Sequence, residues 1–121
     1  MSSSVAEAEL DVEATNVTVT DHALTVELED GRTISAPLQW FPRLRYGSAR
    51  ERANFEIGAF GIHWPDLDED VSVRGLILGR RSAESPASLK FWLDNRKKGR
   101  KVTFEDYMKE RRKKPRTKAR K

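Results

Sequence analysis

Cysteine is absent from this sequence of 121 residues. Its absence excludes disulfides, zinc sites built on thiolates and cysteine nucleophiles, and it fits a reducing compartment. Long apolar runs are missing too, because no stretch approaches the roughly 18 residues that a membrane-spanning helix needs. The opening residues, MSSSVAEAEL, contain neither the basic nor the apolar segment of a secretory signal. We therefore expect a cytoplasmic protein with no membrane contact.

Hydrophobic residues are scarce at 37% of the chain, whereas charged residues make up 35%, so part of the chain must lie outside any core. The length allows one compact domain with little left for a second. The charge is divided unevenly. Residues 96–121 contain 14 Lys and Arg against three acidic residues, while residues 1–95 contain 9 against 16. An acidic body with a basic C-terminal segment indicates a polyanion or an acidic protein as a partner of that segment.

One histidine, one tryptophan, one proline and four carboxylates are concentrated in GIHWPDLDED, residues 61–70. The alternating aspartates resemble the start of a calcium loop, but an EF-hand needs Gly at its sixth position and Glu at its twelfth. Val71 and Ile77 occupy those positions. A zinc site at His63 would need further nitrogen or sulfur ligands. We predict no metal and no cofactor.

Acid–base catalysis by His63 with Asp66 or Asp68 is the enzymatic alternative for this segment. No nucleophile elbow, phosphate-binding loop or paired-carboxylate scaffold accompanies these residues in the sequence. We therefore predict no catalytic residue, and we interpret the segment as a strand at the edge of the core. Pro65 is expected to end that strand, and the acidic residues are expected to form a solvated turn that leads into a helix.

Apolar residues alternate with polar ones in TNVTVTDHALTVELEDGRTISAPL, residues 15–38. This period of two predicts three strands with one covered face. Asp30 and Gly31 predict a type I′ hairpin turn, which needs positive φ at both central positions. Pro37 is expected to end the third strand.

Short helices and further strands are predicted to follow. The expected helices are one interrupted near Pro42 and closed by Gly47, one capped by Ser48, and one that runs from Ser72 to Gly79. One or two further strands are expected between residues 55 and 62. The predicted fold class is α+β: a small antiparallel sheet, formed by a three-stranded N-terminal meander and one or two further strands, packed with short helices and followed by a basic helical C-terminal extension.

The C-terminal helices are predicted from their capping residues. Ser88 is expected to cap the first helix and Gly99 to end it. Thr103 and Asp106 resemble a capping box for the second helix. The predicted organisation is a flexible N-terminus at 1–14, an α+β domain at 15–80, a hinge at 81–88, one or two helices at 89–114, and a disordered basic tail at 115–121.

The segments APLQWFPRL, ERANFEI and GIHWPDLDEDVSVRGLILG together resemble the family known as domain of unknown function 2442. The resemblance covers about residues 15–80. It implies a small bacterial α+β domain, which often occurs beside a partner from domain of unknown function 4160 in pairs described as toxin–antitoxin systems. Some relatives carry a helix-turn-helix segment after the domain, whereas this chain has a short, lysine-rich helix pair there. The signature residues, which serve either the fold or an interface, are Trp40, Pro42, Arg43, Leu44, Asn54, His63, Trp64, Pro65, Asp66, Asp68, Glu69 and Asp70.

The C-terminal helices carry large apolar side chains in a segment that is otherwise highly charged. Such segments often complete their packing on another protein, so we predict a small partner protein, and the resemblance makes an antitoxin-like role the expected function. The alternative is that the apolar stripe packs on the chain's own core. The expected partner-binding residues are Leu89, Trp92, Leu93, Phe104, Tyr107 and Met108.

The basic residues of the same segment predict contact with DNA or RNA, because phosphates need only clustered cations. The alternative is a solvated charge run. If no toxin-like partner exists, the protein is expected to be a nucleic-acid-binding or regulatory protein. The expected nucleic-acid-binding residues are Arg96, Lys97, Lys98, Arg100, Lys101, Arg111, Arg112, Lys113, Lys114, Arg116, Lys118, Arg120 and Lys121.

Overall fold

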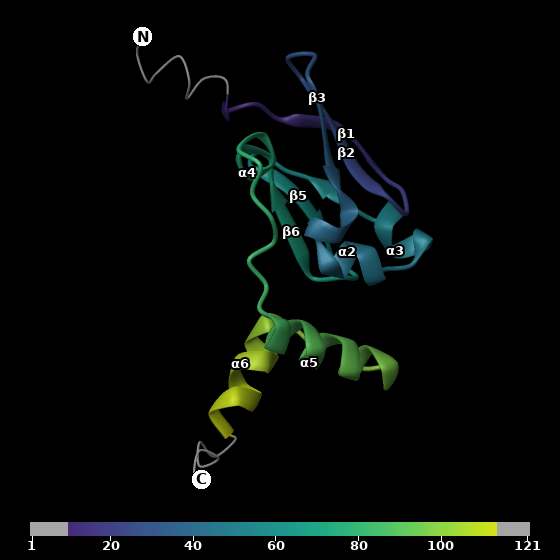
Figure 1. Ribbon diagram of the computed structural model, residues 1–121, viewed down its shortest axis with the longest axis vertical. Coiled ribbons are helices and arrows are strands. Elements are labelled where there is room, and N and C mark those ends of the chain that lie inside the picture. Colours follow the sequence, from purple (N-terminus) through teal and green to yellow (C-terminus); the bar gives the residue numbers. More distant parts are fainter. Residues whose placement is uncertain (1–9, 114–121) are drawn as a thin grey trace. The chain divides into compact units, whose positions relative to one another are not determined.

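The computed structural model describes residues 10–113. The chain divides into two compact units, residues 1–83 and residues 84–121. The N-terminal unit contains antiparallel sheets and short helices, and the described part of the C-terminal unit contains two helices (Figure 1). The predicted α+β class is therefore confirmed. Residues 1–9 of the predicted flexible N-terminus and the whole predicted basic tail, residues 115–121, lie outside the described residues, as does residue 114 at the end of the predicted helices.

The first sheet is the predicted three-stranded meander. It consists of β1 (Ala14–Val19), β2 (Ala23–Leu28) and β3 (Thr33–Pro37), in the order β1-β2-β3 with antiparallel pairing. Leu24 and Val26 on β2 are fully buried, whereas the intervening residues are more exposed. The alternation in the sequence thus identified the covered face correctly, and β3 ends at its proline as expected.

The β2–β3 turn differs from the predicted type I′ turn. Gly31 has a positive φ of +96°, but Asp30 does not. The backbone N–H of Gly31 donates to the carbonyl oxygen of Leu28 at 3.0 Å, and the N–H of Leu28 donates to the carbonyl oxygen of Arg32 at 2.8 Å. These bonds define a three-residue loop with glycine in the left-handed position. The Asp30 carboxylate accepts hydrogen bonds from the backbone N–H and Nε of Arg32, which favours this longer loop.

The second sheet consists of β4 (Glu56–Ile57), β5 (Gly61–Trp64) and β6 (Glu69–Ser72), in the order β4-β5-β6 with antiparallel pairing. The prediction that the whole acidic run forms a turn was wrong, because Glu69 and Val71 are buried on β6 while Asp70 between them is exposed. Only the residues just before β6 form the turn. Carboxylates lie on both faces of β6, so apolar and polar residues do not alternate at its start. The period of two is therefore not visible in the sequence.

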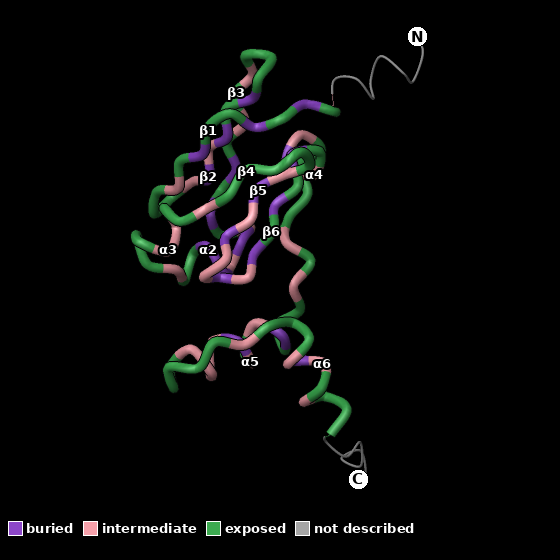
Figure 2. The backbone as a smooth tube through the Cα atoms, turned by 180° about the vertical axis from the view of Figure 1, so that it is seen from behind, coloured by how far each residue is buried: buried purple, intermediate pink, exposed green. Residues whose placement is uncertain are grey.

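Four short helical segments of the described residues connect and cover the strands: η1 (Leu38–Trp40), α2 (Pro42–Tyr46), α3 (Ala49–Ala53) and α4 (Val73–Ile77). The predicted cap at Ser48 and the predicted helix start at Ser72 are confirmed. Ser48 and Glu51 form a reciprocal capping box on α3, and the Ser72 hydroxyl accepts a hydrogen bond from the Gly75 N–H at the start of α4. In Figure 2 the buried residues follow the first sheet, β5, β6 and α2, whereas β4, the loops and α3 are mostly exposed. The core of this unit therefore lies between its strands and α2.

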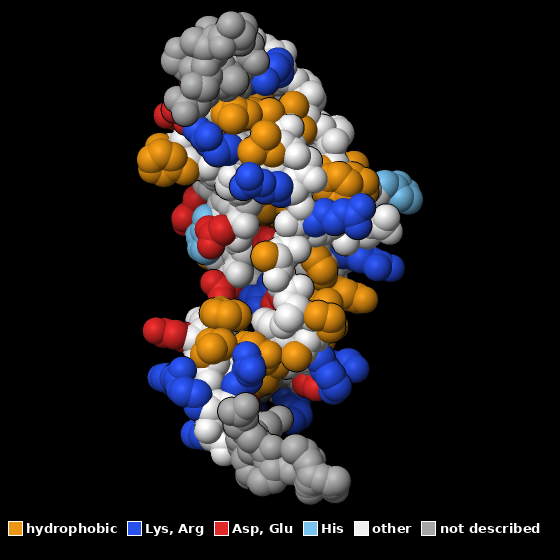
Figure 3. Space-filling view, turned by 60° about the vertical axis from the view of Figure 1, so that its left-hand side comes forward, with side chains coloured by type: hydrophobic (Ala, Val, Ile, Leu, Met, Phe, Trp, Pro, Cys, Tyr) orange, Lys and Arg blue, Asp and Glu red, His pale blue; other side chains and the backbone are white. Residues whose placement is uncertain are grey.

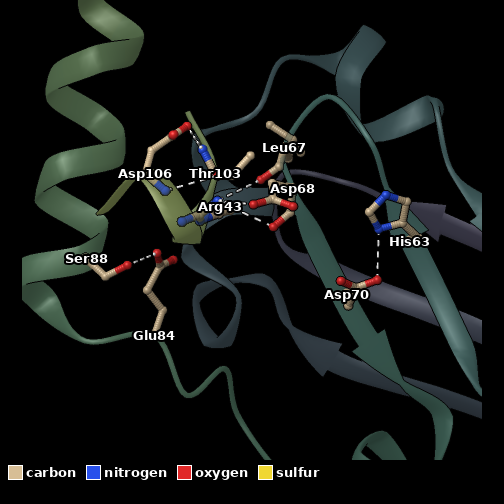
Figure 4. Close-up of polar contacts among 9 residues, drawn as sticks. All are labelled: Arg43, His63, Leu67, Asp68, Asp70, Glu84, Ser88, Thr103 and Asp106. Atoms are coloured by element: carbon tan, nitrogen blue, oxygen red, sulfur yellow. Dashed lines mark hydrogen bonds and ion pairs between the residues drawn. The ribbon is translucent and has the colours of Figure 1, made fainter. Parts of the chain in front are cut away.

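The C-terminal unit contains α5 (Pro86–Lys97) and α6 (Phe104–Lys113). The predicted cap of α5 was wrong, because Ser85 rather than Ser88 accepts the capping hydrogen bond and Pro86 occupies the first turn. Proline fits this position because its fixed φ is helical and its missing N–H would be unpaired anyway. Ser88 lies inside the helix, where its buried hydroxyl donates to the Glu84 carboxylate at 2.8 Å (Figure 4).

The other predicted ends of these helices are confirmed. Gly99 has a φ of +75°, and the N–H groups of Gly99 and Arg100 donate to carbonyl oxygens of the last turn of α5, as in a Schellman motif. Thr103 and Asp106 form a reciprocal box at the start of α6, with N–O distances of 2.9 and 3.2 Å (Figure 4). Aspartate therefore replaces the usual Glu or Gln of the box. No helix in the described part is long and apolar enough to cross a membrane.

Candidate functional site

The buried Arg43 organises the β5–β6 turn. Its side chain is only about 5% exposed. Its Nη1 donates to the carbonyl oxygen of Leu67 at 3.2 Å and lies 3.8 Å from a carboxylate oxygen of Asp68 (Figure 4). Asp68 has a positive φ of +49°, which non-glycine residues rarely adopt. Charge-assisted bonds to this turn hold it in that conformation, so Arg43 and Asp68 serve the fold.

Trp64 is the largest fully buried side chain of the described residues. Its indole Nε1 donates to the carbonyl oxygen of Arg52 at 3.0 Å, and its ring lies 6.3 Å from that of Phe55. Nearby in the sequence, Asn54 donates from Nδ2 to the Asp66 carboxylate at 2.9 Å. These contacts connect α3 and the residues after it to the second sheet. The signature residues Trp64, Asn54 and Asp66 therefore also serve the fold.

Five further residues of the signature also have structural positions. Leu44 is fully buried, and Pro42 occupies the first turn of α2. Trp40 is half-buried, with the Arg81 guanidinium 4.8 Å from the centre of its ring. Pro65 directly follows β5, as expected, and Glu69 is buried on β6.

Arg52 is a structural residue that the sequence reasoning missed. Its Nε donates to the carbonyl oxygen of Leu44 and its Nη2 to that of Arg45, both at 2.8 Å. These carbonyls lie in the last turn of α2, where helical carbonyls have no intrahelical donor. Its Nη1 donates to Asp21, also at 2.8 Å. No spacing rule reveals this role, because the partners lie in separate elements.

We predict that Arg52→Gln raises the pKa of Asp21 toward its ordinary value of 3.8. The hydrogen bond and charge of Arg52 hold the pKa of this carboxyl below that value. Because the folded-state pKa is depressed, the pair contributes stability above the unfolded-state pKa and loses it as pH falls through the folded-state pKa. An NMR titration of the Asp carboxyls measures the change. The pKa of Asp30, which is lowered by Arg32, should stay constant, and an unchanged Asp21 would contradict the prediction.

His63 and Asp70 differ from the rest of the signature, because they lie on the outer face of the second sheet. Their positions are directly opposite on β5 and β6, and His63 Nδ1 lies 2.8 Å from the Asp70 carboxylate (Figure 4). Glu56 on β4 is opposite His63 on the other side. The three residues thus form a row across the exposed face, flanked by a hollow of about 440 Å³.

Ser72 lies two residues after Asp70 on β6. The Ser72 hydroxyl on the same strand accepts the capping hydrogen bond of α4, so it serves the helix start. No group of three or more His, Asp or Glu side chains within residues 10–113 is arranged to hold a metal ion. Fixed carboxylates beside an imidazole on an open face are suited to recognising a positively charged group.

The C-terminal helices pack through aromatic rings. Tyr107 on α6 is buried, and its ring lies 5.5 Å from that of Phe91 and 5.8 Å from that of Phe104. Phe104 remains 55% exposed. A groove of about 340 Å³ between the helices is lined by both polar and aromatic side chains, including Phe91 and Tyr107. Figure 3 shows hydrophobic and basic side chains next to one another over these helices.

The predicted partner-binding residues differ in how far they are exposed. Trp92 is only 5% exposed, with the Arg96 guanidinium 5.1 Å from its ring centre. Buried Tyr107 has Arg111 over its ring at 5.9 Å. Phe104 is the most accessible of the set, and three further members are half-buried: Leu89, Leu93 and Met108.

The predicted nucleic-acid-binding residues lie on both sides of the α5–α6 connection and along α6. Arg96 is half-buried against Trp92. The exposed members are Lys97, Lys98, Arg100, Lys101, Arg111, Arg112 and Lys113. The remaining five, namely Lys114, Arg116, Lys118, Arg120 and Lys121, lie outside the described residues.

The family model DUF2442, described as a protein of unknown function, matches residues 14–82 of this chain. The crystal structure of a protein of unknown function from Rhodospirillum rubrum is similar to it, with 27% sequence identity and a TM-score of 0.52. That match covers 60% of this chain and 93% of the other. The family match lies within the N-terminal unit.

The solution NMR structure of an uncharacterised protein from Chromobacterium violaceum is also similar. It is 19% identical, has a TM-score of 0.55, and is matched over 76% of this chain and 83% of its own. At that identity the likeness shows the fold alone. The comparison with curated proteins gives no match.

Proposed function

The chain belongs to the DUF2442 family of proteins of unknown function, and we propose that it acts as a bacterial binding protein rather than as an enzyme. In this proposal it is the antitoxin-like half of a two-protein complex. Helices α5 and α6 contact a small partner protein, and the basic C-terminal residues are able to contact nucleic acid.

The composition of the C-terminal unit carries the proposal. Its described residues include only three buried side chains, those of Ser88, Trp92 and Tyr107. Both helices nevertheless begin with side-chain caps. So small a core contributes little hydrophobic stabilisation. A pre-formed helix pair with an exposed ring at Phe104 and a groove lined by polar and aromatic side chains is suited to being completed by another protein.

Phe104→Ser is expected to weaken the complex with the small protein encoded beside this one by about 30-fold or more, because truncating a hot-spot aromatic typically costs at least 2 kcal/mol. Phe60→Ser provides the matched control, since Phe60 is also an exposed phenylalanine but lies in the N-terminal unit. Titration calorimetry with the co-expressed and separated partner measures both. Equal affinities for Phe104→Ser and the unaltered chain would refute the assignment of this surface.

The second candidate function is nucleic-acid binding, and the charge of the C-terminal unit favours it. Residues 84–121 contain 15 Lys and Arg against five acidic residues, whereas residues 1–83 contain 8 against 14. Binding through phosphates releases counterions, so the logarithm of affinity should fall linearly with the logarithm of salt concentration, by about 0.9 per neutralised phosphate on duplex DNA.

Arg112→Glu combined with Lys113→Glu tests this candidate without disturbing a buried side chain, because both residues are exposed. Fluorescence anisotropy with a labelled DNA duplex should give a lower affinity and a salt slope reduced by about one for each lost phosphate contact. Glu27→Lys, which adds charge in the other unit, should leave the slope constant. Binding that is insensitive to salt would rule the electrostatic contact out.

A further inference from the structure

The outer face of the second sheet is acidic and lacks a covering element among the described residues of the N-terminal unit. Glu56, His63 and Asp70 stand in one row across β4, β5 and β6. Since neighbouring strands lie about 4.8 Å apart, the two carboxylate positions are separated by about 10 Å. No cation within residues 10–113 forms an ion pair with Glu56. We name this surface, formed by Glu56, Phe60, His63 and Asp70, the acidic sheet face.

Phe60 stands at one end of the acidic sheet face and is 86% exposed. The other exposed aromatic side chains of the described part have partners: Tyr46 has the Arg45 guanidinium 5.5 Å from its ring centre, and Phe104 contacts Tyr107. Neither a ring nor a guanidinium of the described residues contacts Phe60. An exposed, unpartnered large ring beside fixed charges is typical of an interaction site.

The conformation of the β4–β5 loop keeps Phe60 in this exposed place. The Gly58 N–H donates to the Gly61 carbonyl oxygen at 2.9 Å, and the Val73 N–H donates to the Phe60 carbonyl oxygen at 3.2 Å. A Cβ at Gly61 would lie 2.3 Å from the Val71 carbonyl oxygen, so glycine permits this close approach of the two strands. Backbone hydrogen bonds thus fix the loop that carries the exposed ring.

Acidic residues lie on both sides of Phe60. The hollow of about 440 Å³ on one side contains Glu56 and Asp70. A second hollow of about 400 Å³ on the other side also contains Phe60, together with Asp11, Glu13 and Glu29, and its one basic residue is Arg74. Arg74 is already paired with Asp11 at 3.2 Å. The excess of carboxylates favours a cationic partner over a nucleic acid or an anionic membrane.

Arginine and lysine match this combination of a ring and carboxylates. Their aliphatic stems cover apolar surface while their charged ends reach carboxylates, and a guanidinium over an aromatic ring is itself stabilising. The chain already uses this pairing at Trp40 with Arg81 and at Trp92 with Arg96. A ligand for the acidic sheet face should therefore present several Arg and Lys side chains along one side of an extended segment.

The chain's own C-terminal sequence has this pattern. In KPRTKARK, residues 114–121, basic residues alternate with Pro, Thr and Ala, at Lys114, Arg116, Lys118 and Arg120. In an extended segment alternate side chains point to the same side, so these four cations would share one face. We propose that the acidic sheet face binds residues 114–121 of a second copy of this chain, with one cation against Phe60 and others paired with Glu56 and Asp70.

The association should be weak and dependent on ionic strength. Exposed ion pairs contribute little individually, so we expect a Kd of about 10–100 µM rather than a permanent dimer. The Debye length falls from about 10 Å at 0.1 M salt to about 3 Å at 1 M, and the affinity should fall at least about tenfold across that range. The inference does not rest on the proposed partner complex, because the acidic sheet face lies on the N-terminal unit. It does share residues 114–121 with the proposed nucleic-acid contact, and for this reason the test uses nuclease-treated protein.

Sedimentation velocity on the purified, nuclease-treated full-length chain tests the proposal. Asp70→Lys should weaken self-association at least about tenfold, because it replaces an attracting carboxylate by a repelling cation. Phe60→Ser should weaken it without any change of charge. Glu27→Lys makes the same charge change on an exposed residue of β2 and should have little effect, and Phe104→Ser should have none. Circular dichroism spectra establish that each variant remains folded.

A mixing experiment shows whether the two surfaces meet between copies. A tail variant that combines Arg116→Glu, Lys118→Glu and Arg120→Glu retains the acidic sheet face, whereas Asp70→Lys retains the basic segment. Each variant alone should be monomeric at 0.1 M salt, and an equimolar mixture should restore dimers, because one productive pairing remains.

Three results would overturn the proposal. They are a wild-type chain that stays monomeric at sub-millimolar concentration and 0.1 M salt, equal weakening by Asp70→Lys and Glu27→Lys, and a mixture of the two variants that stays monomeric. If the wild-type chain stays monomeric, the acidic sheet face would instead be expected to bind a different basic protein. Association that disappears with nuclease treatment would instead identify a nucleic-acid bridge between basic segments.

Discussion

Trp64→Ala is expected to lower the free energy of unfolding by about 3–5 kcal/mol, the range measured when large aromatic side chains are truncated in a core. The Trp64 side chain is fully buried, so the substitution leaves a cavity beneath the second sheet. It also removes the hydrogen bond from Nε1 to the carbonyl oxygen of Arg52. For a small domain whose total stability is about 5–15 kcal/mol, this is a large fraction.

Urea unfolding followed by far-ultraviolet circular dichroism measures the change as a shift of the midpoint at constant slope. Trp40→Ala is the matched control, because Trp40 is a signature tryptophan that is only half-buried and covered by Arg81. Its loss should cost about 1 kcal/mol, as expected for one cation–π contact and partial burial. Similar losses for the two substitutions would show that Trp64 does not have the central packing role described above.

Arg43→Met should destabilise the N-terminal unit by about 2–4 kcal/mol. Methionine fills much of the same volume, but it leaves the carbonyl oxygens of Leu67 and Asp68 without the charged donor that now serves them. The positive φ of Asp68 would then have to be maintained without that support. Arg43→Lys should give an intermediate loss, since lysine keeps the charge but cannot reproduce the planar fork of donors.

Arg74→Met is the control for this second prediction. Arg74 also forms an ion pair with an aspartate, but both side chains are substantially exposed, and such surface pairs contribute about 0–1 kcal/mol. The same urea titration compares the variants. A loss at Arg43 no greater than the loss at Arg74 would mean that the β5–β6 turn keeps its conformation without the guanidinium.

Local chemistry made much of the fold predictable from the sequence. The caps at Ser48 and Thr103 and the helix start at Ser72 were identified correctly, because each depends on a side chain bonding to a backbone N–H three residues away. The strands of the first sheet followed from the alternation of apolar residues. These features require no knowledge of distant parts of the chain.

The features that were missed depend on tertiary partners or on competing local bonds. The Arg43 contact with Leu67 joins residues 24 positions apart, so no spacing rule could predict it. Strand β6 was concealed because buried Glu69 occupies an inward position where the pattern would require an apolar residue. The start of α5 was misplaced because Ser85 and Ser88 are equivalent by residue type, and Pro86 decides between them.

The division of the family signature also needed the structure. The sequence could not separate residues that serve the fold from residues that serve an interface. The strand register places His63 and Asp70 on the outer face, while Arg43, Leu44 and Trp64 are buried. The signature therefore contains a structural set and an exposed pair, and the exposed pair is where substitutions should affect binding without affecting stability.

Co-purification with the protein encoded beside this one is the most direct test of the proposed binding function. The full-length chain and a chain that ends at Ala83 would each be co-expressed with that neighbour, treated with nuclease and purified by affinity. Ala83 is the last residue of the N-terminal unit, so the shorter chain retains every strand of both sheets. We expect the full-length chain to retain a small protein in stoichiometric amount and the shorter chain to lose it. Equal retention by both chains, or retention by neither, would contradict a partner-binding role for helices α5 and α6.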